Sequence, residues 1–240
     1  MVARTRIGRG GFEEAKLNEI ASITVDVVSD VVCPWCFIGQ KRLERAVDAV
    51  PEVDVTVRWR PFQLDPTIPE EGLDRRDYML GKFGSDERIR EIHERISALG
   101  VAEGIAFDFD AIEVAPNTLN AHRLIRWAGT AGEEAQNQVV RRLFKLNFED
   151  GANLGDNEVL VGVARECGMD APVVETLLPT DADREAVTNE IATASRMGIT
   201  GVPCFLLESK YAVMGAQDAE TLADAIRKVG EAKARGELEG

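Results

Sequence analysis

The sequence predicts an α/β fold in which a βαβ unit is split by a long α-helical insertion. Residues 23–28 alternate apolar and polar side chains with the period of a β-strand, and the next segment repeats apolar side chains with the period of an α-helix. The segment 73–197 then has almost wholly helical periodicity, and a strand pattern returns only at 203–207. The strands before and after this helical segment are therefore expected to form one sheet.

The first part of the sheet unit contains two strands joined by a helix. The alternation over 23–28 gives the first strand, and the helix after it carries one apolar stripe made of Leu43, Ala46, Val47 and Val50. Pro51 ends this helix. Apolar side chains then occupy every second position over 53–59, which predicts a strand with one buried face, and Pro61 begins a loop.

Three apolar stripes predict helices inside the segment 73–197. They are formed by Ile89, Ile92, Ile96 and Leu99, by Ala121, Leu124, Ile125 and Ala128, and by Leu160, Val163, Ala164 and Cys167. Asp156 is the predicted N-cap of the third helix. Because Cys167 lies on an apolar stripe, we expect it to be a buried structural thiol.

The C-terminal segment completes the sheet. Strands are predicted over 203–207 and 211–214, and a final helix shows an apolar face of Leu222, Ala225, Ile226 and Val229. We therefore divide the chain into a flexible N-terminal extension (1–21), a first sheet part (22–70), a helical insertion (71–197) and a second sheet part with the C-terminal helix (198–240).

Length and charge limit the classes of function. With 240 residues and 45% hydrophobic content, the chain is long enough to bury a core without disulfide staples. Its formal net charge of -14 argues against nucleic acid and an anionic membrane surface as partners, and no apolar run is long enough to span a membrane. The N-terminal residues contain several arginines but no apolar stretch of signal-peptide length. We therefore expect a cytoplasmic protein.

The stretch Cys33-Pro34-Trp35-Cys36 carries the most chemical information. It lies between the first strand and the first helix, so one thiol is placed at a helix N-terminus, where backbone N–H groups and the macrodipole favour a thiolate. A thiolate attacks disulfides, and two cysteines on one helical turn can also close a disulfide. We therefore expect Cys33, the more exposed of the pair, to attack and Cys36 to resolve the mixed disulfide.

The competing interpretation of such a cysteine pair is half of a zinc site. A structural zinc site needs four ligands, commonly a second cysteine pair or histidines at a fixed spacing. The remaining candidates are isolated in the sequence and show no such spacing: His93, His122, Cys167 and Cys204. The sequence therefore predicts redox chemistry and no metal, with zinc as the alternative to be tested.

Release of a mixed disulfide also needs a proton acceptor near the resolving thiol. Asp26 and Asp30 precede the motif, and either carboxylate is a candidate general base, directly or through water. Strand alternation against Val25 and Val27 favours a solvent-facing Asp26, and a loop position favours a solvent-facing Asp30. The pattern alone therefore favours two exposed carboxylates.

Three stretches carry a resemblance to a known family. They are Ser29-Asp30-Val31-Val32-Cys33-Pro34-Trp35-Cys36, Asn117-Thr118-Leu119-Asn120-Ala121-His122-Arg123-Leu124 and Gly198-Ile199-Thr200-Gly201-Val202-Pro203. Together they resemble the DsbA-like thioredoxin-fold oxidoreductases, and among them the FrnE-like branch. The resemblance implies a thioredoxin fold split by an α-helical insertion domain.

The resemblance also implies a cis peptide bond between Val202 and Pro203, next to the cysteine pair. Such a bond leaves backbone groups free to pair with an extended substrate segment, whereas the other interpretation of Pro203 is a proline that begins a strand. The helix of His122 would lie over the active-site face, where the imidazole tunes Cys33 or contacts substrate; ordinary helix packing is the alternative. The expected substrate-binding residues are therefore Pro34, Trp35, Val202, Pro203 and His122.

Several other residues have two interpretations. Cys204 follows the expected cis-proline and is either a small core residue or a third redox thiol close to Cys33. Asn117 is expected to be a helix N-cap. We expect solvated positions for Arg123, Arg126, Arg141 and Arg142.

The predicted function is a thiol–disulfide oxidoreductase, acting as an oxidase, isomerase or reductase on proteins or small molecules that contain thiols or disulfides. We expect no cofactor, with glutathione as a candidate redox partner. The alternative is a glutathione-dependent isomerase or transferase, because kappa-class transferases and hydroxychromene-carboxylate isomerases share the split fold; those relatives typically carry serine at the position of Cys33. A protein-binding module with an apolar surface around Trp35 and Phe37 is the third hypothesis. The oligomeric state stays open, a homodimer included.

Overall fold

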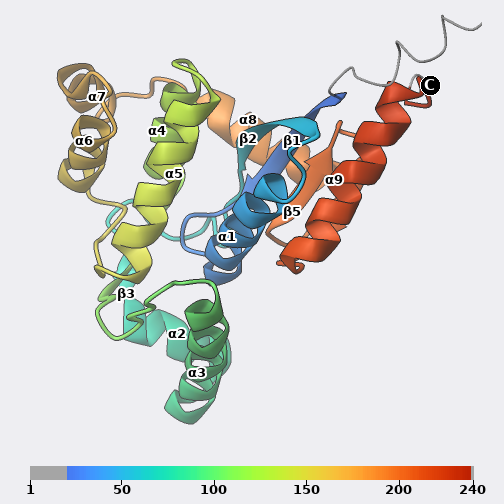
Figure 1. Cartoon of the computed structure of the whole chain (residues 1–240). Coiled ribbons are helices and arrows are strands. Elements are labelled where there is room, and N and C mark those ends of the chain that lie inside the picture. Colours follow the sequence, from blue (N-terminus) through green and yellow to red (C-terminus); the bar gives the residue numbers. More distant parts are fainter. Residues whose placement is uncertain (1–20, 239–240) are drawn as a thin grey trace, which may run out of the picture.

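The computed structural model describes residues 21–238, and the predicted extension over 1–21 lies outside them apart from Ala21. The central sheet has the strand order β2-β1-β5-β6, formed by β1 (Ala21–Ser29), β2 (Val53–Pro61), β5 (Cys204–Leu207) and β6 (Tyr211–Met214). β1 runs parallel to β2 and antiparallel to β5, so that Val27 lies between Trp59 and Phe205. Segments far apart in the sequence thus form one mixed sheet (Figure 1), which confirms the predicted split unit.

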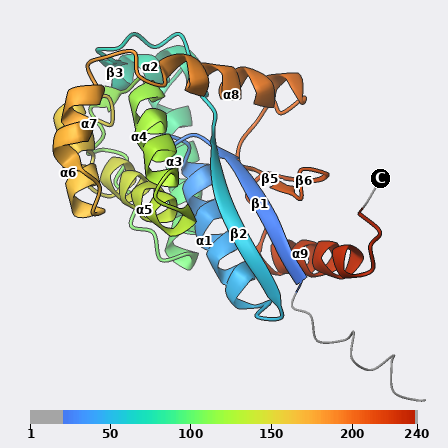
Figure 2. The same cartoon turned by 90° about the horizontal axis from the view of Figure 1, so that it is seen from above.

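Helices cover both faces of this sheet. α1 (Pro34–Asp48) and α9 (Ala219–Ala234) pack on one face, and α8 (Arg184–Arg196) lies on the other, as seen in Figure 1 and Figure 2. The side chains of β1 divide between the two faces: Val25 and Val27 belong to the main core with Phe205, whereas Val28 packs with Cys204 near α8. β1 is therefore an inner strand with no solvated face.

The insertion between β2 and β5 is mainly helical. α2 (Arg75–Phe83) and α3 (Asp86–Ala102) form a hairpin below the sheet unit in Figure 1. α4 (Leu119–Gly129) and α5 (Glu133–Phe148) pack beside β2, and α6 (Asn157–Glu166) and α7 (Ala171–Leu177) lie next to them. The sequence does not predict the short strands β3 (Leu73–Asp74) and β4 (Val114–Ala115), because two residues show no alternation.

Side-chain caps explain several helix starts. Asp156 accepts a hydrogen bond from the Glu158 N–H at 2.8 Å, which confirms it as the N-cap of α6. Before α4, the Oδ1 of Asn117 accepts from the Leu119 N–H at 3.0 Å, although Thr118 occupies the cap position itself. These bonds satisfy N–H groups that a first helical turn leaves without intrahelical partners.

An aromatic cluster joins α1 to the insertion. The Phe37 ring stacks on Phe144 with centroids 5.2 Å apart, and Phe107 meets it edge-on at 5.9 Å. Phe37 is therefore only 3% exposed. The hypothesis of an apolar docking surface around Trp35 and Phe37 is wrong for Phe37, because residues of the insertion already cover its ring.

Arg123 is a buried cation, contrary to the expectation of a solvated position. It has 0% exposure, and its guanidinium donates hydrogen bonds of 2.7–3.0 Å to Asn120 Oδ1 and to the carbonyl oxygens of Leu177, Leu178, Thr180 and Ala182. The side chain thereby ties α4 to the chain that connects α7 with α8. The other three arginines are partly exposed, as predicted: Arg126, Arg141 and Arg142.

Candidate active site

The Cys33-Pro34-Trp35-Cys36 motif forms the N-terminal end of α1. Cys33 is the N-cap residue, with an extended backbone (φ −94°, ψ 113°). Pro34 follows at the first helical position, where a backbone N–H would have no intrahelical partner, so the absence of this group in proline costs no hydrogen bond. The Cys33 carbonyl oxygen accepts hydrogen bonds from the N–H groups of Cys36 at 3.0 Å and Phe37 at 3.3 Å. Both cysteines thus lie on one turn at the positive end of the helix macrodipole.

Both thiols are free and buried. Cys33 is 3% exposed and Cys36 is 1% exposed, so Cys33 is the more exposed of the pair by a small margin only. Burial raises the pKa of Cys36 well above the ordinary thiol value, and the adjacent Cys33 raises it further, against weaker opposing bonds from Ser29 and the Asp30 backbone. Cys36 is therefore a protonated thiol at neutral pH, and its use as a nucleophile requires a proton acceptor.

The Val202–Pro203 segment lies beside the motif although it is distant in the sequence. Its peptide bond is cis, as predicted, and the Cys33 thiol donates a long hydrogen bond of 3.7 Å to the Val202 carbonyl oxygen. Gly39 of α1 permits this close approach, since a Cβ atom there would lie 2.9 Å from Pro203 Cγ. Gly39 is not predictable from the sequence, because no local pattern marks a glycine that a distant contact requires.

A cavity of about 350 Å³ opens next to Cys33. Three predicted substrate-binding residues line it together with Cys33, namely Pro34, Trp35 and Val202. α2 and α3 supply apolar walls that include Met79, Phe83, Ile92 and Ile96. Pro203, in contrast, is buried and does not border the cavity. The volume is in the range of small-molecule sites, so a substrate sulfur can approach Cys33 from the side of the insertion.

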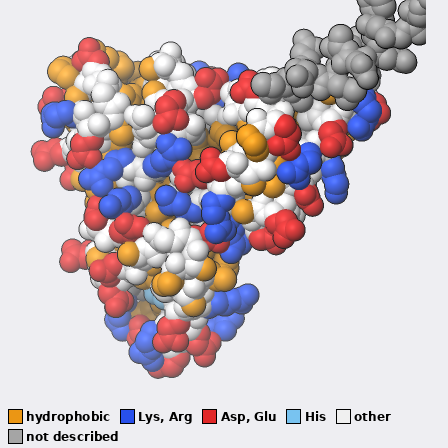
Figure 3. Space-filling model, viewed as in Figure 1, with side chains coloured by type: hydrophobic (Ala, Val, Ile, Leu, Met, Phe, Trp, Pro, Cys, Tyr) orange, Lys and Arg blue, Asp and Glu red, His pale blue; other side chains and the backbone are white. Residues whose placement is uncertain are grey.

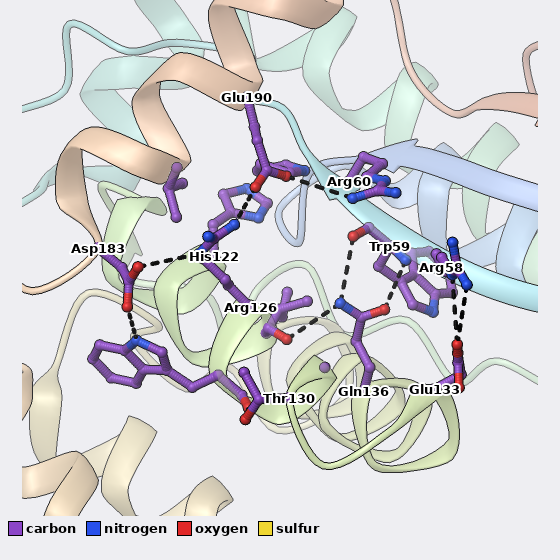
Figure 4. Close-up of a pocket in the computed structure, with 15 residues that line it drawn as sticks. Arg58, Trp59, Arg60, His122, Arg126, Thr130, Glu133, Gln136, Asp183 and Glu190 are labelled. Atoms are coloured by element: carbon purple, nitrogen blue, oxygen red, sulfur yellow. Dashed lines mark hydrogen bonds and ion pairs between the residues drawn. The ribbon is translucent and has the colours of Figure 1, made fainter. Parts of the chain in front are cut away.

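The structure places His122 in the interior rather than on the wall of the Cys33 cavity. Its imidazole is 3% exposed, and Nε2 lies 3.4 Å from Asp30 Oδ1. The ring borders a second cavity of about 340 Å³ between β2, α4 and α8, where Arg60, Arg126 and Glu190 form a chain of ion pairs (Figure 4). His122 therefore lies beside Asp30 and does not border the Cys33 cavity.

Asp30 and Asp26 are both buried, so the expectation of two solvent-facing carboxylates is wrong. Asp30 is 1% exposed, its Oδ2 accepts from the Leu64 N–H at 2.8 Å, and it borders the Cys33 cavity. Asp26 is 8% exposed and pairs with Arg60 at 2.7 Å on the side of α8. For Asp26 the expectation fails because β1 is covered on both faces, whereas alternation predicts only one. For Asp30 it fails because Leu64 and His122 enclose this loop residue. Asp30 is thus the better candidate for a proton acceptor.

A model of the DSBA-like thioredoxin domain family matches residues 24–227, which is most of the chain. The protein belongs to this family. It is similar to the crystal structure of the probable DsbA oxidoreductase SCO1869 from Streptomyces coelicolor, with a TM-score of 0.80, 31% identity, and coverage of 91% of this chain and 92% of that one.

The chain is also similar to one further protein in sequence and to one further solved structure. The uncharacterized protein YwbO of Bacillus subtilis is 27% identical over 190 residues, which cover 78% of this chain and 87% of YwbO. A structure of 2-hydroxychromene-2-carboxylate isomerase has a TM-score of 0.66 at 16% identity, over 88% of this chain and 98% of that one. At that identity the isomerase shares the fold alone. The DSBA-like family therefore confirms the predicted thioredoxin fold with a helical insertion.

This DSBA-like protein has two further cysteines in its described part. Cys204 is fully buried with Val28 on the α8 side of the sheet, whereas Cys33 belongs to the main core on the opposite side, and burial raises the pKa of the Cys204 thiol. This placement favours a core residue over a third redox thiol. Cys167 is the C-cap of α6 and is half-buried against the main core, so the prediction of a buried structural thiol is only partly correct.

Within residues 21–238 of this DSBA-like protein, no group of three or more histidine, cysteine or acidic side chains is arranged to hold a metal ion. Zinc at the cysteine pair would need further ligands close to it. The helices of the same segment include none with the length and hydropathy of a membrane span.

Proposed function

We propose that the protein is a thiol–disulfide oxidoreductase that cycles Cys33 and Cys36 between a dithiol and a disulfide. The placement of Cys33 carries this proposal: the residue caps α1, is next to Cys36 and borders an open cavity. Membership of the DSBA-like family supports substrates that contain thiols or disulfides.

Each chemical step exchanges one S–S bond for another. The Cys33 thiolate attacks a substrate disulfide, a Cys33–substrate disulfide forms, and one substrate sulfur leaves as a thiolate with the electron pair of the broken bond. Cys36 then gives up its proton and attacks Cys33 Sγ, which closes the protein disulfide and releases the second substrate thiolate. The protein is oxidised by two electrons and the substrate disulfide is reduced. The reverse sequence oxidises a dithiol substrate.

In this proposal, Pro34, Trp35 and Val202 contact the substrate, and Pro203 holds the Val202 backbone where an extended segment can pair with it. Glutathione is the candidate small-molecule redox partner, and the cytoplasm is the proposed compartment. The glutathione poise of the cytosol would keep many such pairs reduced, which favours a reductase or isomerase. The FrnE-like branch and a homodimer stay predictions.

Equilibration of the protein in a series of glutathione redox buffers tests this proposal. We expect a reversible intramolecular disulfide between Cys33 and Cys36, detected by thiol alkylation and peptide mass spectrometry. Its midpoint would place the protein among reductants or oxidants. Absence of this disulfide, with glutathione bound only non-covalently or with a metal on the thiols, would contradict the proposal.

A glutathione-dependent isomerase is the second candidate, and the fold shared with 2-hydroxychromene-2-carboxylate isomerase is the observation that favours it. Such a reaction does not need a second thiol. Cys36→Ala would therefore keep isomerase activity, whereas it would prevent closure of the protein disulfide.

Asp30→Asn is expected to slow release of the mixed disulfide about tenfold to hundredfold at neutral pH, because an amide cannot accept the Cys36 proton. Burial raises the pKa of Cys36, so its thiolate fraction increases as pH rises. The wild-type rate should therefore rise with pH, and the deficit of the variant should shrink in alkaline solution, where hydroxide removes the proton. Single-turnover release of substrate thiol from about pH 6 to 9 measures this difference.

Asp26→Asn is the matched control, because Asp26 is also buried but pairs with Arg60 on the other side of the sheet. We expect its pH profile to follow that of the wild type. A constant deficit of Asp30→Asn at every pH would assign Asp30 a structural role only.

A further inference from the structure

Arg75 is a cation in the wall of the Cys33 cavity, and no acidic side chain within residues 21–238 forms an ion pair with it. It is the first residue of α2 and is half-buried. Across residues 21–238, no carboxylate forms an ion pair or a hydrogen bond with its guanidinium. The neighbouring Arg76, by contrast, is exposed and pairs with Asp86 at 2.9 Å. Acidic and basic side chains are interspersed over the face seen in Figure 3.

Burial is the main influence on the pKa values of Arg75 and of His93 beside it. Burial lowers the pKa of Arg75, and the electrostatic interaction with Tyr78 opposes this shift. The pKa of His93 is lowered mainly by burial and further by the positive charge of Arg75, whereas the negative charge of Asp110 raises it. His93 borders the same cavity and stacks on Phe109 at 4.2 Å. A cation removed from water without a partner is destabilised, and an anion bound beside it relieves this.

The two carboxylates that border the cavity are engaged elsewhere. Asp30 accepts from the Leu64 N–H and faces His122. Asp65 accepts from the N–H and the hydroxyl of Thr67 at 3.0 and 2.5 Å. Neither acid pairs with Arg75, so this guanidinium is available to a ligand in the cavity.

We propose that Arg75 is the anion-binding residue of the Cys33 cavity, and that the preferred substrates are thiols and disulfides with a carboxylate on an apolar body. This inference rests on the proposed oxidoreductase function. A guanidinium can donate two parallel hydrogen bonds to one carboxylate. Met79, Phe83 and Ile92 supply the apolar wall for the body of the substrate. The carboxylate comes either from a small thiol acid or from an acidic residue beside a peptide cysteine.

The sulfur chemistry is unchanged by this contact. Cys33 attacks the substrate disulfide, the electron pair of the broken S–S bond leaves with the substrate thiolate, and the carboxylate keeps its charge throughout. Arg75 therefore acts on recognition alone, and its removal should affect anionic substrates selectively.

Reduced wild-type protein and Arg75→Met are compared in their rates with two aromatic disulfides, the anionic dithiobis(nitrobenzoate) and the neutral dithiodipyridine. We expect Arg75→Met to lower the rate with the anionic disulfide about tenfold relative to the neutral one. Arg75→Lys should restore part of this ratio, because it returns the charge without the planar fork. Arg76→Met is the matched control and should leave the ratio unchanged, because Arg76 is exposed and does not line the cavity.

A second pair of probes distinguishes the source of the carboxylate. Two short peptide disulfides differ only in glutamate or glutamine beside the cysteine. A selective loss confined to dithiobis(nitrobenzoate) identifies a small thiol acid, and a selective loss that includes the glutamate peptide identifies an acidic peptide. An equal loss with anionic and neutral probes, an unchanged ratio, or the same effect in Arg76→Met would overturn the proposal. A wild-type protein that reacts with neither disulfide would instead refute the oxidoreductase function.

Discussion

Replacing Cys33 by serine is expected to lower the rate of disulfide reduction by about 10³-fold or more, because a hydroxyl at neutral pH supplies no thiolate-like nucleophile. Cys33 is the cysteine that borders the cavity, and Cys36 lies behind it with 1% exposure. A substrate sulfur therefore meets Cys33 first. The measurement is the second-order rate of the reduced protein with dithiodipyridine, with the released thione followed by absorbance.

Cys36→Ser separates attack from release. This variant keeps Cys33 and should form the mixed disulfide, yet it should stall there, and intact-protein mass spectrometry would detect the adduct. Cys167→Ser is the matched control, because Cys167 lies at the end of α6, away from the cavity wall. A Cys33→Ser variant with wild-type turnover, or a Cys167→Ser variant with the larger loss, would place the reactive thiol elsewhere.

Local sequence patterns were sufficient to predict the first strands and helix of the fold and the reactive cysteine pair. Strand alternation over 23–28 and 53–59 gave β1 and β2, and the cysteine motif gave the start of α1. The family resemblance added the cis bond before Pro203. These features are predictable because each is encoded within a few consecutive residues.

The buried polar residues around the cysteine pair and on α4 could not be predicted in the same way. Asp30, His122 and Arg123 are each buried by an element distant in the sequence, and neither strand alternation nor helical periodicity reports which neighbour covers a polar side chain. Gly39 matters because Pro203 lies close to it, and Arg75 matters because no carboxylate of the described residues pairs with it. Residues that influence the thiols or the choice of substrate, without reacting themselves, are therefore identified only from the tertiary structure.

Arg123→Met is expected to lower the free energy of unfolding by about 3 kcal/mol, which is the size of effect seen when one partner of a buried charged network is removed. Methionine fills the apolar path of the arginine stem but leaves the carbonyl oxygens of Leu177, Leu178, Thr180 and Ala182 without their donor. Buried carbonyl groups without a partner carry the penalty of lost hydration. Urea unfolding, followed by circular dichroism, measures the change.

Arg126→Met is the matched control one helical turn later on α4, where the side chain is 41% exposed and pairs with Asp183 at 3.3 Å and with Glu190. An exposed ion pair of this kind contributes about 1 kcal/mol or less, so the control should remain close to wild type. Since Arg123 does not border the Cys33 cavity, the folded fraction of Arg123→Met should keep its rate with dithiodipyridine. Equal destabilisation by the two variants would mean that water replaces the lost donors of Arg123, and that the connection between α7 and α8 opens readily to solvent.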